Sequence, residues 1–432
     1  MIKKYKKLNL LPGDKIEIVI NDKIEKGIFL ESYDKRILLL KLENGYNIGL
    51  KKENISKIKI LKRVREKKTK VFQLKLDDKK PIIDLIICGG TISSKLDYKS
   101  GGVKDLTEIN EFFKTYPEIF EKANIRIKSP FMKASENIGA LEWIKLAKIV
   151  GKSLNNPEVK GVIITHGTDF LHYTGSALSF MLGKLNKPDV LTYSQRSSDR
   201  GSSDARLNLI CSAEIALSDI AEVTLVGHAT INDNYCHVLQ ANKCRKMHTS
   251  RRDAFKPINC EIIAKIWPDK IEMLRYDINK RNNQKVIVDA VFNEKIALIK
   301  FSPCCDPKIL DFYLKNNYKG IVIEMSGLGH VSLEGKYNWE SKLKEIIKKG
   351  MIVYAVPQTL YGRLNPYVYS PGRKLKEINV NYLEDILPET AFVKLGWILG
   401  HPQWRGSIIT NEKMKQNISR EFNTRLGKEF ID

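Results

Sequence analysis

The sequence that organises this chain is PIIDLIICGGTI, at residues 81–92. An apolar run of strand length ends there in Gly89, Gly90 and Thr91. Buried strands of parallel sheets show such runs, and ligands in open α/β sheets bind just beyond the carboxyl ends of the strands. The glycines let the backbone turn sharply and let a substrate approach closely, while Thr91 offers a hydroxyl group. Apolar strands also end in Gly-Gly turns without any function, so this stretch predicts a site only beside a second motif.

Two further stretches of sequence support a functional site at this turn. The sequence GVIITHGTD at residues 161–169 repeats the pattern, because an apolar strand is followed by a turn that carries Thr168 and Asp169. A third candidate is Lys246, in the segment CRKMHTS at residues 244–250. A threonine, a Thr-Asp pair and a lysine are the residue types from which a nucleophile, an orienting acid and a base are built.

Composition limits the class of protein. At 432 residues the chain is long enough for two or three domains with substantial cores. Lys and Arg number 73 against 50 Asp and Glu, which gives a formal net charge of +23. Such an excess suits an RNA partner, although lysine is abundant throughout the chain and no RNA-reading motif is visible.

Cysteine usage and hydropathy predict the compartment. The seven cysteines are an odd number without a disulfide spacing, which favours a reducing cytosol. The spacing of Cys236, His237, Cys244 and His248 matches no familiar zinc module, so we predict no metal site. No apolar run reaches the ~18 residues of a membrane span, and we expect a cytoplasmic protein.

The amino-terminal part reads as a module of short strands. Alternating residues at 15–20 lead to a plausible turn at Asn21-Asp22, and further strands are predicted at 27–32, 37–42 and 47–50. This spacing predicts a small β-barrel over residues 1–62, which carries no chemistry and is interpreted as a docking module. Residues 63–80 are a charged linker, or alternatively an RNA-binding strip.

From residue 81 onward, strands alternate with helical patterns. A helix is predicted over 141–154 and another over 173–185, with strands at 161–165 and 222–227. This alternation predicts a largely parallel sheet with helices on both faces, over residues 81–280. A smaller α/β domain follows over residues 281–432.

These motifs resemble the L-asparaginase/glutaminase family. The resemblance rests on GGTI at 89–92, HGTD at 166–169 and the Lys246 segment. The fuller strings ISSKLDYKSGGV at 92–103 and RKMHTSRRDAF at 245–255 are more specifically similar to the D subunits of archaeal glutamyl-tRNA(Gln) amidotransferases. One departure is Cys88, where the family usually has Thr; both side chains are small. The resemblance implies an asparaginase-like two-domain parallel-sheet fold preceded by the small β-barrel.

The same resemblance assigns roles to the candidate catalytic residues. Thr91 would be the nucleophile, with Tyr98 on a lid over residues 95–102 as its proton-handling partner. Thr168, Asp169 and Lys246 would form a second cluster. The sequence leaves open the alternative in which Thr168 attacks and Thr91 assists.

The substrate's amino-acid end needs an anion site and a cation site. The string ASEN at residues 134–137 resembles the family's substrate-gripping turn. Ser135 would bond the α-carboxylate, and Glu136 with Asp169 would pair with the α-ammonium group; the alternative reading of Ser135-Glu136 is a helix start. We predict the substrate-binding residues to be Ser135, Glu136, Gly90 and Gly167. His166 is interpreted as structural.

The resemblance also implies a role within a complex. The chain would hydrolyse glutamine and pass ammonia to a partner, the E subunit, that holds glutamyl-tRNA(Gln) and uses ATP and magnesium. No cofactor is predicted in this chain. The loop at residues 327–330 matches one that reaches the active site of a neighbouring copy, which predicts a homodimer within a heterotetramer. The alternatives are a free-standing cytosolic L-asparaginase and, from another class, an inactive RNA-binding scaffold.

Overall fold

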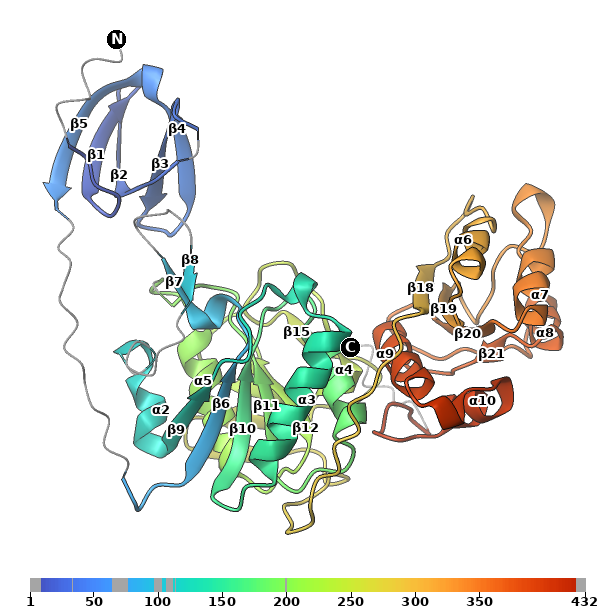
Figure 1. Ribbon diagram of the computed structural model, residues 1–432. Coiled ribbons are helices and arrows are strands. Elements are labelled where there is room, and N and C mark those ends of the chain that lie inside the picture. The colour runs from blue at the N-terminus through green and yellow to red at the C-terminus, as the bar shows by residue number, and fades with distance from the viewer. Residues whose placement is uncertain are drawn as a thin grey trace.

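The computed structural model describes residues 9–32, 34–63, 77–96, 103–105, 112, 114–198 and 200–424. Figure 1 shows three bodies, each built around one main sheet: an amino-terminal β-body, a large central α/β body and a smaller carboxyl-terminal α/β body. The asparaginase-like α/β fold that the sequence predicted is confirmed, and the small β-barrel predicted before it is observed as a five-stranded antiparallel sheet.

The amino-terminal body is a five-stranded antiparallel sheet with the order β4-β3-β2-β1-β5. Asn21 and Asp22 both have positive φ, as a tight two-residue hairpin turn requires, and they join the first two strands. Alternate residues such as Ile16, Ile18 and Leu40 point inward and form a core of their own. The strands are β1 (Lys15–Ile20), β2 (Lys23–Leu30), β3 (Ile37–Leu42), β4 (Asn47–Lys51) and β5 (Ile55–Lys62).

Because the amino-terminal sheet has a core of its own, we predict that the rest of the chain folds without it. Arg200 joins the sheet to the central body, because its guanidinium group donates to the Gly45 carbonyl oxygen at 2.9 Å and lies over the Tyr46 ring. We expect deletion of residues 1–70 to leave the melting temperature of the remainder within a few degrees and to weaken coupling to a partner protein. Circular dichroism melting and partner pull-down measure the two effects. Aggregation of the truncated chain would show instead that the two parts share one core.

The central body contains an eight-stranded mixed sheet with the order β17-β16-β13-β12-β11-β10-β6-β9. The neighbours from β9 to β12 are parallel, whereas β13, β16 and β17 are antiparallel. Its strands are β6 (Ile82–Ile87), β9 (Asn124–Lys128), β10 (Val159–Thr165), β11 (Asp189–Thr192), β12 (Val223–His228), β13 (Cys236–Gln240), β16 (Ala264–Trp267) and β17 (Lys270–Met273). Thus the sheet is parallel on the side that carries the first two motifs.

Strand β6 contains one charged residue, Asp84, whose side chain is fully buried. Its carboxylate pairs with Arg126 at 2.8 Å and with Lys128 at 2.6 Å, both on the neighbouring strand β9. Buried carboxylates persist where they are paired and hydrogen-bonded, so this contact offsets the cost of placing a charge in the strand.

Helices cover both faces of this sheet, as Figure 1 shows. They are α2 (Pro117–Lys122), α3 (Ala140–Leu154), α4 (Leu171–Met181) and α5 (Ala205–Leu217). In α3 the side chains of Trp143, Leu146 and Val150 recur at helical spacing and are buried. The Glu142 carboxylate accepts the Gly139 backbone N–H at 3.0 Å and so caps the first turn.

The carboxyl-terminal body has a four-stranded parallel sheet with the order β18-β19-β20-β21. Its strands are β18 (Ile296–Lys300), β19 (Gly320–Met325), β20 (Ile352–Pro357) and β21 (Asn381–Tyr382). Its helices are α6 (Ile309–Lys315), α7 (Glu340–Lys348), α8 (Ser370–Glu377), α9 (Pro388–Leu399) and α10 (Ser407–Lys415). Helix α9 packs against both this sheet and α4, so one hydrophobic core spans the two α/β bodies.

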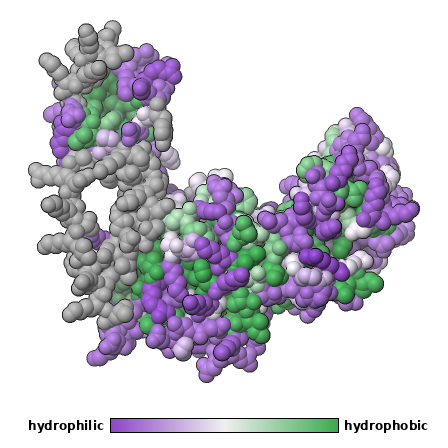
Figure 2. Space-filling view, in the orientation of Figure 1, coloured by the Kyte–Doolittle hydropathy of each residue, from purple (hydrophilic) through white to green (hydrophobic). Residues whose placement is uncertain are grey.

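The hydropathy of the visible surface differs between the central and the carboxyl-terminal bodies. In the view of Figure 2, hydrophilic residues cover most of the carboxyl-terminal body, while hydrophobic patches are visible on the central body. Within the described residues, no helix combines the length and apolar character needed to cross a membrane. The same part of the chain contains no group of three metal-ligating side chains placed to hold an ion.

Candidate active site

The first two motifs lie side by side at the carboxyl edge of the parallel strands. Strands β6 and β10 are neighbours, and Ile87 is in register with Thr165. Gly89 and Gly90 have φ values of +119° and +86°, a region that favours glycine. A Cβ atom on Gly90 would lie 2.5 Å from the His166 carbonyl oxygen, so glycine allows the two turns to touch.

The Thr91 turn is a short 3-10 helix, η3 (Thr91–Ser93), that is fixed from two sides. The Ser93 hydroxyl lies 2.7 Å from the Thr165 hydroxyl at the end of β10. The Tyr116 hydroxyl donates to the Ile92 carbonyl oxygen at 2.7 Å. The sequence analysis did not predict this contact between Ser93 and Thr165, although both hydroxyl residues flank the two motifs.

Lys246 reaches the second turn from a distant part of the sequence. It ends strand β14 (Cys244–Lys246), which pairs antiparallel with β15 (Phe255–Pro257). Its ammonium group donates to the Thr168 hydroxyl and to the Asp169 carboxylate, both at 2.7 Å. The Lys246 side chain is 10% exposed, whereas that of Asp169 is 63% exposed. The structure therefore assembles a threonine, a carboxylate and a largely buried lysine at the edge of the sheet.

The predicted substrate-gripping turn adjoins this cluster. Ser135 is buried in the 3-10 helix η4 (Ser135–Asn137), and its hydroxyl accepts the Phe170 backbone N–H at 3.4 Å. A Cβ atom on Gly167 would lie 3.0 Å from the Cβ of Ser135. Glu136 is exposed beside them. Ser135 and Gly167 thus lie together, in contact with the turn that carries Asp169.

His166 is bonded into the fold. Its Nδ1 lies 2.7 Å from the Gly167 carbonyl oxygen, which can only accept, so Nδ1 carries the proton. Its Nε2 lies 3.0 Å from the Thr174 hydroxyl, which itself accepts Trp143 Nε1–H at 3.0 Å. Burial lowers the pKa of His166 to about 4, against the backbone hydrogen bond that raises it. The imidazole is therefore neutral near pH 7 and supports the turn that carries Thr168.

Tyr98 and the tip of the predicted lid lie outside the described residues. The described ends of this segment form a hairpin in which β7 (Ser94–Leu96) pairs with β8 (Val103–Asp105). The role given to Tyr98 by the family resemblance stays a prediction.

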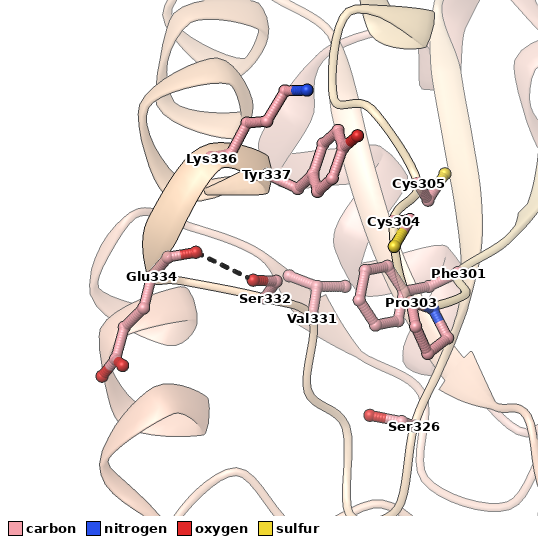
Figure 3. Close-up of a pocket in the computed structure, with 10 residues that line it drawn as sticks. All are labelled: Phe301, Pro303, Cys304, Cys305, Ser326, Val331, Ser332, Glu334, Lys336 and Tyr337. Atoms are coloured by element: carbon pink, nitrogen blue, oxygen red, sulfur yellow. Dashed lines mark hydrogen bonds between the residues drawn. The ribbon is translucent and has the colours of Figure 1, made fainter.

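A separate cavity of about 430 Å³ lies in the carboxyl-terminal body, beyond the ends of β18 and β19. Figure 3 shows the Tyr337 and Phe301 rings on either side of the Cys304 thiol, and the Ser332 hydroxyl bonded to the Glu334 carbonyl oxygen at 3.1 Å. The lining residues are Phe301, Pro303, Cys304, Cys305, Ser326, Val331, Ser332, Glu334, Lys336 and Tyr337. They include none of the predicted catalytic residues, so this cavity is distinct from the candidate site.

Fold and site together define the class of an asparaginase-type amidohydrolase. Residues 82–279 match the family described as Asparaginase, N-terminal, and residues 295–408 match the Glutaminase/Asparaginase C-terminal domain. The thermostable L-asparaginase of Thermococcus kodakarensis has a similar structure, with a TM-score of 0.72 and 26% identity, over 80% of this chain and 100% of that one.

The amino-terminal sheet identifies a particular family within this class. Residues 10–61 match the GatD N-terminal domain. The glutamyl-tRNA(Gln) amidotransferase D subunit of Pyrococcus abyssi is 45% identical over 92% of both chains. The D subunit of Methanosphaera stadtmanae is 39% identical over 98% of this chain and 96% of that one. The chain belongs to the family of glutamyl-tRNA(Gln) amidotransferase D subunits.

Proposed function

We propose that this chain hydrolyses glutamine to glutamate and ammonia as the glutaminase subunit of a glutamyl-tRNA(Gln) amidotransferase. The observation that carries the proposal is the Lys246 contact with Thr168 and Asp169 at the same sheet edge as Thr91. Similarity to amidotransferase D subunits, together with the match of the amino-terminal sheet, favours this function over that of a free-standing L-asparaginase.

The chemistry requires covalent catalysis, because a carboxamide is a poor electrophile and a neutral hydroxyl is a poor nucleophile. In our proposal the Thr91 oxygen attacks the carboxamide carbon and its proton passes to a base. Backbone N–H groups of the glycine turns stabilise the oxyanion. The base returns this proton to the leaving nitrogen, so that breaking the C–N bond releases ammonia and leaves a glutamyl ester on the threonine. Water then hydrolyses the ester to glutamate and regenerates the hydroxyl.

The contacts of Lys246 distinguish the two threonines. Thr168 is the hydroxyl that Lys246 bonds, and Thr91 is the proposed nucleophile. Asp169 balances the charge of Lys246. A lysine acts as a base only when it loses its proton, and a neighbouring carboxylate opposes that loss. We therefore assign Asp169 to orientation and to the substrate's ammonium group. Ser135 is assigned to the α-carboxylate, with Glu136, Gly90 and Gly167 beside the substrate.

The ammonia needs an acceptor, which we propose to be glutamyl-tRNA(Gln) held by a second protein, the amidotransferase E subunit. That partner would bind ATP and magnesium, because activation of the tRNA-linked carboxyl group needs a phosphorylating cofactor and we assign none to this chain. We propose a homodimer of this chain within a heterotetramer, in the cytoplasm, where aminoacyl-tRNA is used.

Partner dependence tests this function. We expect ammonia release from glutamine to be weak for the chain alone and to rise at least tenfold when the E subunit and glutamyl-tRNA(Gln) are added. The physical reason is a population shift: a partner that contacts the closed state of the site favours that state. Steady-state ammonia release is compared for the chain alone, with partner, and with partner and charged tRNA. Equal rates in all three mixtures, with asparagine preferred over glutamine, would support the asparaginase alternative.

A further inference from the structure

The strand that carries Lys246 is held on its other face by the carboxyl-terminal body. Lys246 and Arg245 are consecutive in β14, and successive side chains of a strand point to opposite faces. Lys246 points to Thr168 and Asp169. Arg245 points the other way, and its Nε lies 3.3 Å from Oε1 of Glu389, in the first turn of α9.

Three contacts join the segment at residues 242–245 to the segment at residues 385–390. The Thr390 hydroxyl donates to the Asn242 carbonyl oxygen at 2.8 Å. The buried Lys243 ammonium pairs with the buried Asp385 carboxylate at 2.9 Å. The Arg245–Glu389 pair is the third contact and lies next to Lys246. Because β14 is three residues long, these contacts from residues 385–390 contribute much of what holds it in place.

Glu389 depends on Arg245 for charge compensation. Its side chain is 1% exposed, and neither of its oxygens has a hydrogen-bond partner within the described residues. His172 of α4 lies 3.6 Å away, but burial, with Arg245 nearby, lowers the pKa of His172 to about 3, so it is neutral. Burial raises the pKa of Glu389, Arg245 opposes that rise, and Glu324 of β19 adds to it. Arg245 is therefore the cation that balances this carboxyl group.

We propose that Arg245 and Glu389 are a positioning pair that holds Lys246 in place for glutamine hydrolysis, and so makes the reaction depend on the packing of α9. The inference rests on the role proposed above for Lys246. Neither residue touches the substrate in this account; both act through the strand. The charged and titratable groups around the pair and Lys246 are His172 and Tyr173 of α4, Glu324 of β19, and Asp169 and His166 after β10.

The test uses the full chain with its partner protein, and the variants Glu389→Gln, Arg245→Gln and both together. We expect each single variant to lower kcat for ammonia release about 10- to 100-fold with KM for glutamine changed less than threefold. The double variant should be no worse than the poorer single one, because coupled residues fail together. Glu214→Gln is the control, since Glu214 of α5 pairs with Lys122 of α2 and neither residue belongs to the contacts that hold β14.

Two readouts separate positioning from mere stability: the fall in kcat at nearly unchanged KM for glutamine, and its rescue by a conservative substitution. Arg245→Lys should recover most of kcat, because the contact with Glu389 is single. If Arg245→Gln does not fold, Arg245→Lys and Glu389→Gln carry the test.

Two results would overturn the inference: kcat values indistinguishable from that of Glu214→Gln, or losses in the two single variants that multiply in the double one. Lys246→Ala is measured in parallel. If it is inactive while the pair variants are normal, only the positioning inference fails. If it retains hydrolysis, the proposed role of Lys246 fails, and the inference with it.

Discussion

Thr91→Val and Lys246→Ala are each expected to lower ammonia release from glutamine by several orders of magnitude while the chain stays folded and partner-bound. The first substitution removes the hydroxyl that we assign as the nucleophile and replaces it with a methyl group of similar size. The second removes the ammonium group that bonds Thr168 and Asp169. Members of such a catalytic unit act together, so each single loss should cost nearly as much as both.

The measurement is single-turnover and steady-state ammonia release, with thermal melting to check the fold. Thr224→Val is the matched control, because Thr224 is buried in β12 and its hydroxyl has no hydrogen-bond partner within the described residues. That variant should keep wild-type activity. Near-normal hydrolysis by both Thr91→Val and Lys246→Ala would remove the proposed mechanism.

The same experiment separates the two threonine assignments. A glutamine analogue with an electrophilic diazoketone labels the attacking hydroxyl, and peptide mass spectrometry locates the label. We expect the label on Thr91. A label on Thr168 would exchange the roles of the two residues, since Thr168 is the hydroxyl that Lys246 contacts.

Gly90→Ala is expected to destabilise the chain by about 2–5 kcal/mol and to reduce ammonia release at least a hundredfold. A side chain at φ +86° costs roughly 1–2 kcal/mol, and overpacking adds roughly 1–3 kcal/mol. The added Cβ would lie 2.5 Å from the His166 carbonyl oxygen and 2.6 Å from Gly167 N. Backbone atoms cannot rotate away, so the turn that leads to Thr168 must move.

Gly183→Ala supplies the control for this prediction. Gly183 follows α4 with φ +58°, but nothing lies within 4 Å of the Cβ it would gain. We expect a loss of about 1–2 kcal/mol from strain alone, and wild-type ammonia release. Denaturant unfolding and activity assays measure both variants. A Gly90→Ala protein that matches Gly183→Ala in both measurements would show that the contact between the two turns is not needed.

Much of the fold was predictable from local patterns. Apolar runs predicted the strands β6, β10 and β12, and the periodic apolar residues predicted the helix α3. Such segments are predictable because their secondary structure depends on which side chains close together in the sequence are buried. The sequence interpretation missed β5, whose alternating isoleucines lie among lysines and border the charged linker. It also predicted a largely parallel sheet, whereas β13, β16 and β17 run antiparallel. Strand order and direction depend on long-range pairing, which no local pattern records.

Local patterns were also sufficient to predict the two turns of the candidate site. Gly89-Gly90-Thr91 and His166-Gly167-Thr168-Asp169 each follow an apolar strand, and in a parallel sheet such strands end at one edge. Which further groups meet there became visible only in the folded chain. Lys246 lies 78 residues from Thr168 in the chain yet donates to its hydroxyl. Arg245 meets Glu389 because α9 packs against α4. Contacts between such distant segments arise from the packing of whole bodies, which local periodicity and turn chemistry do not specify.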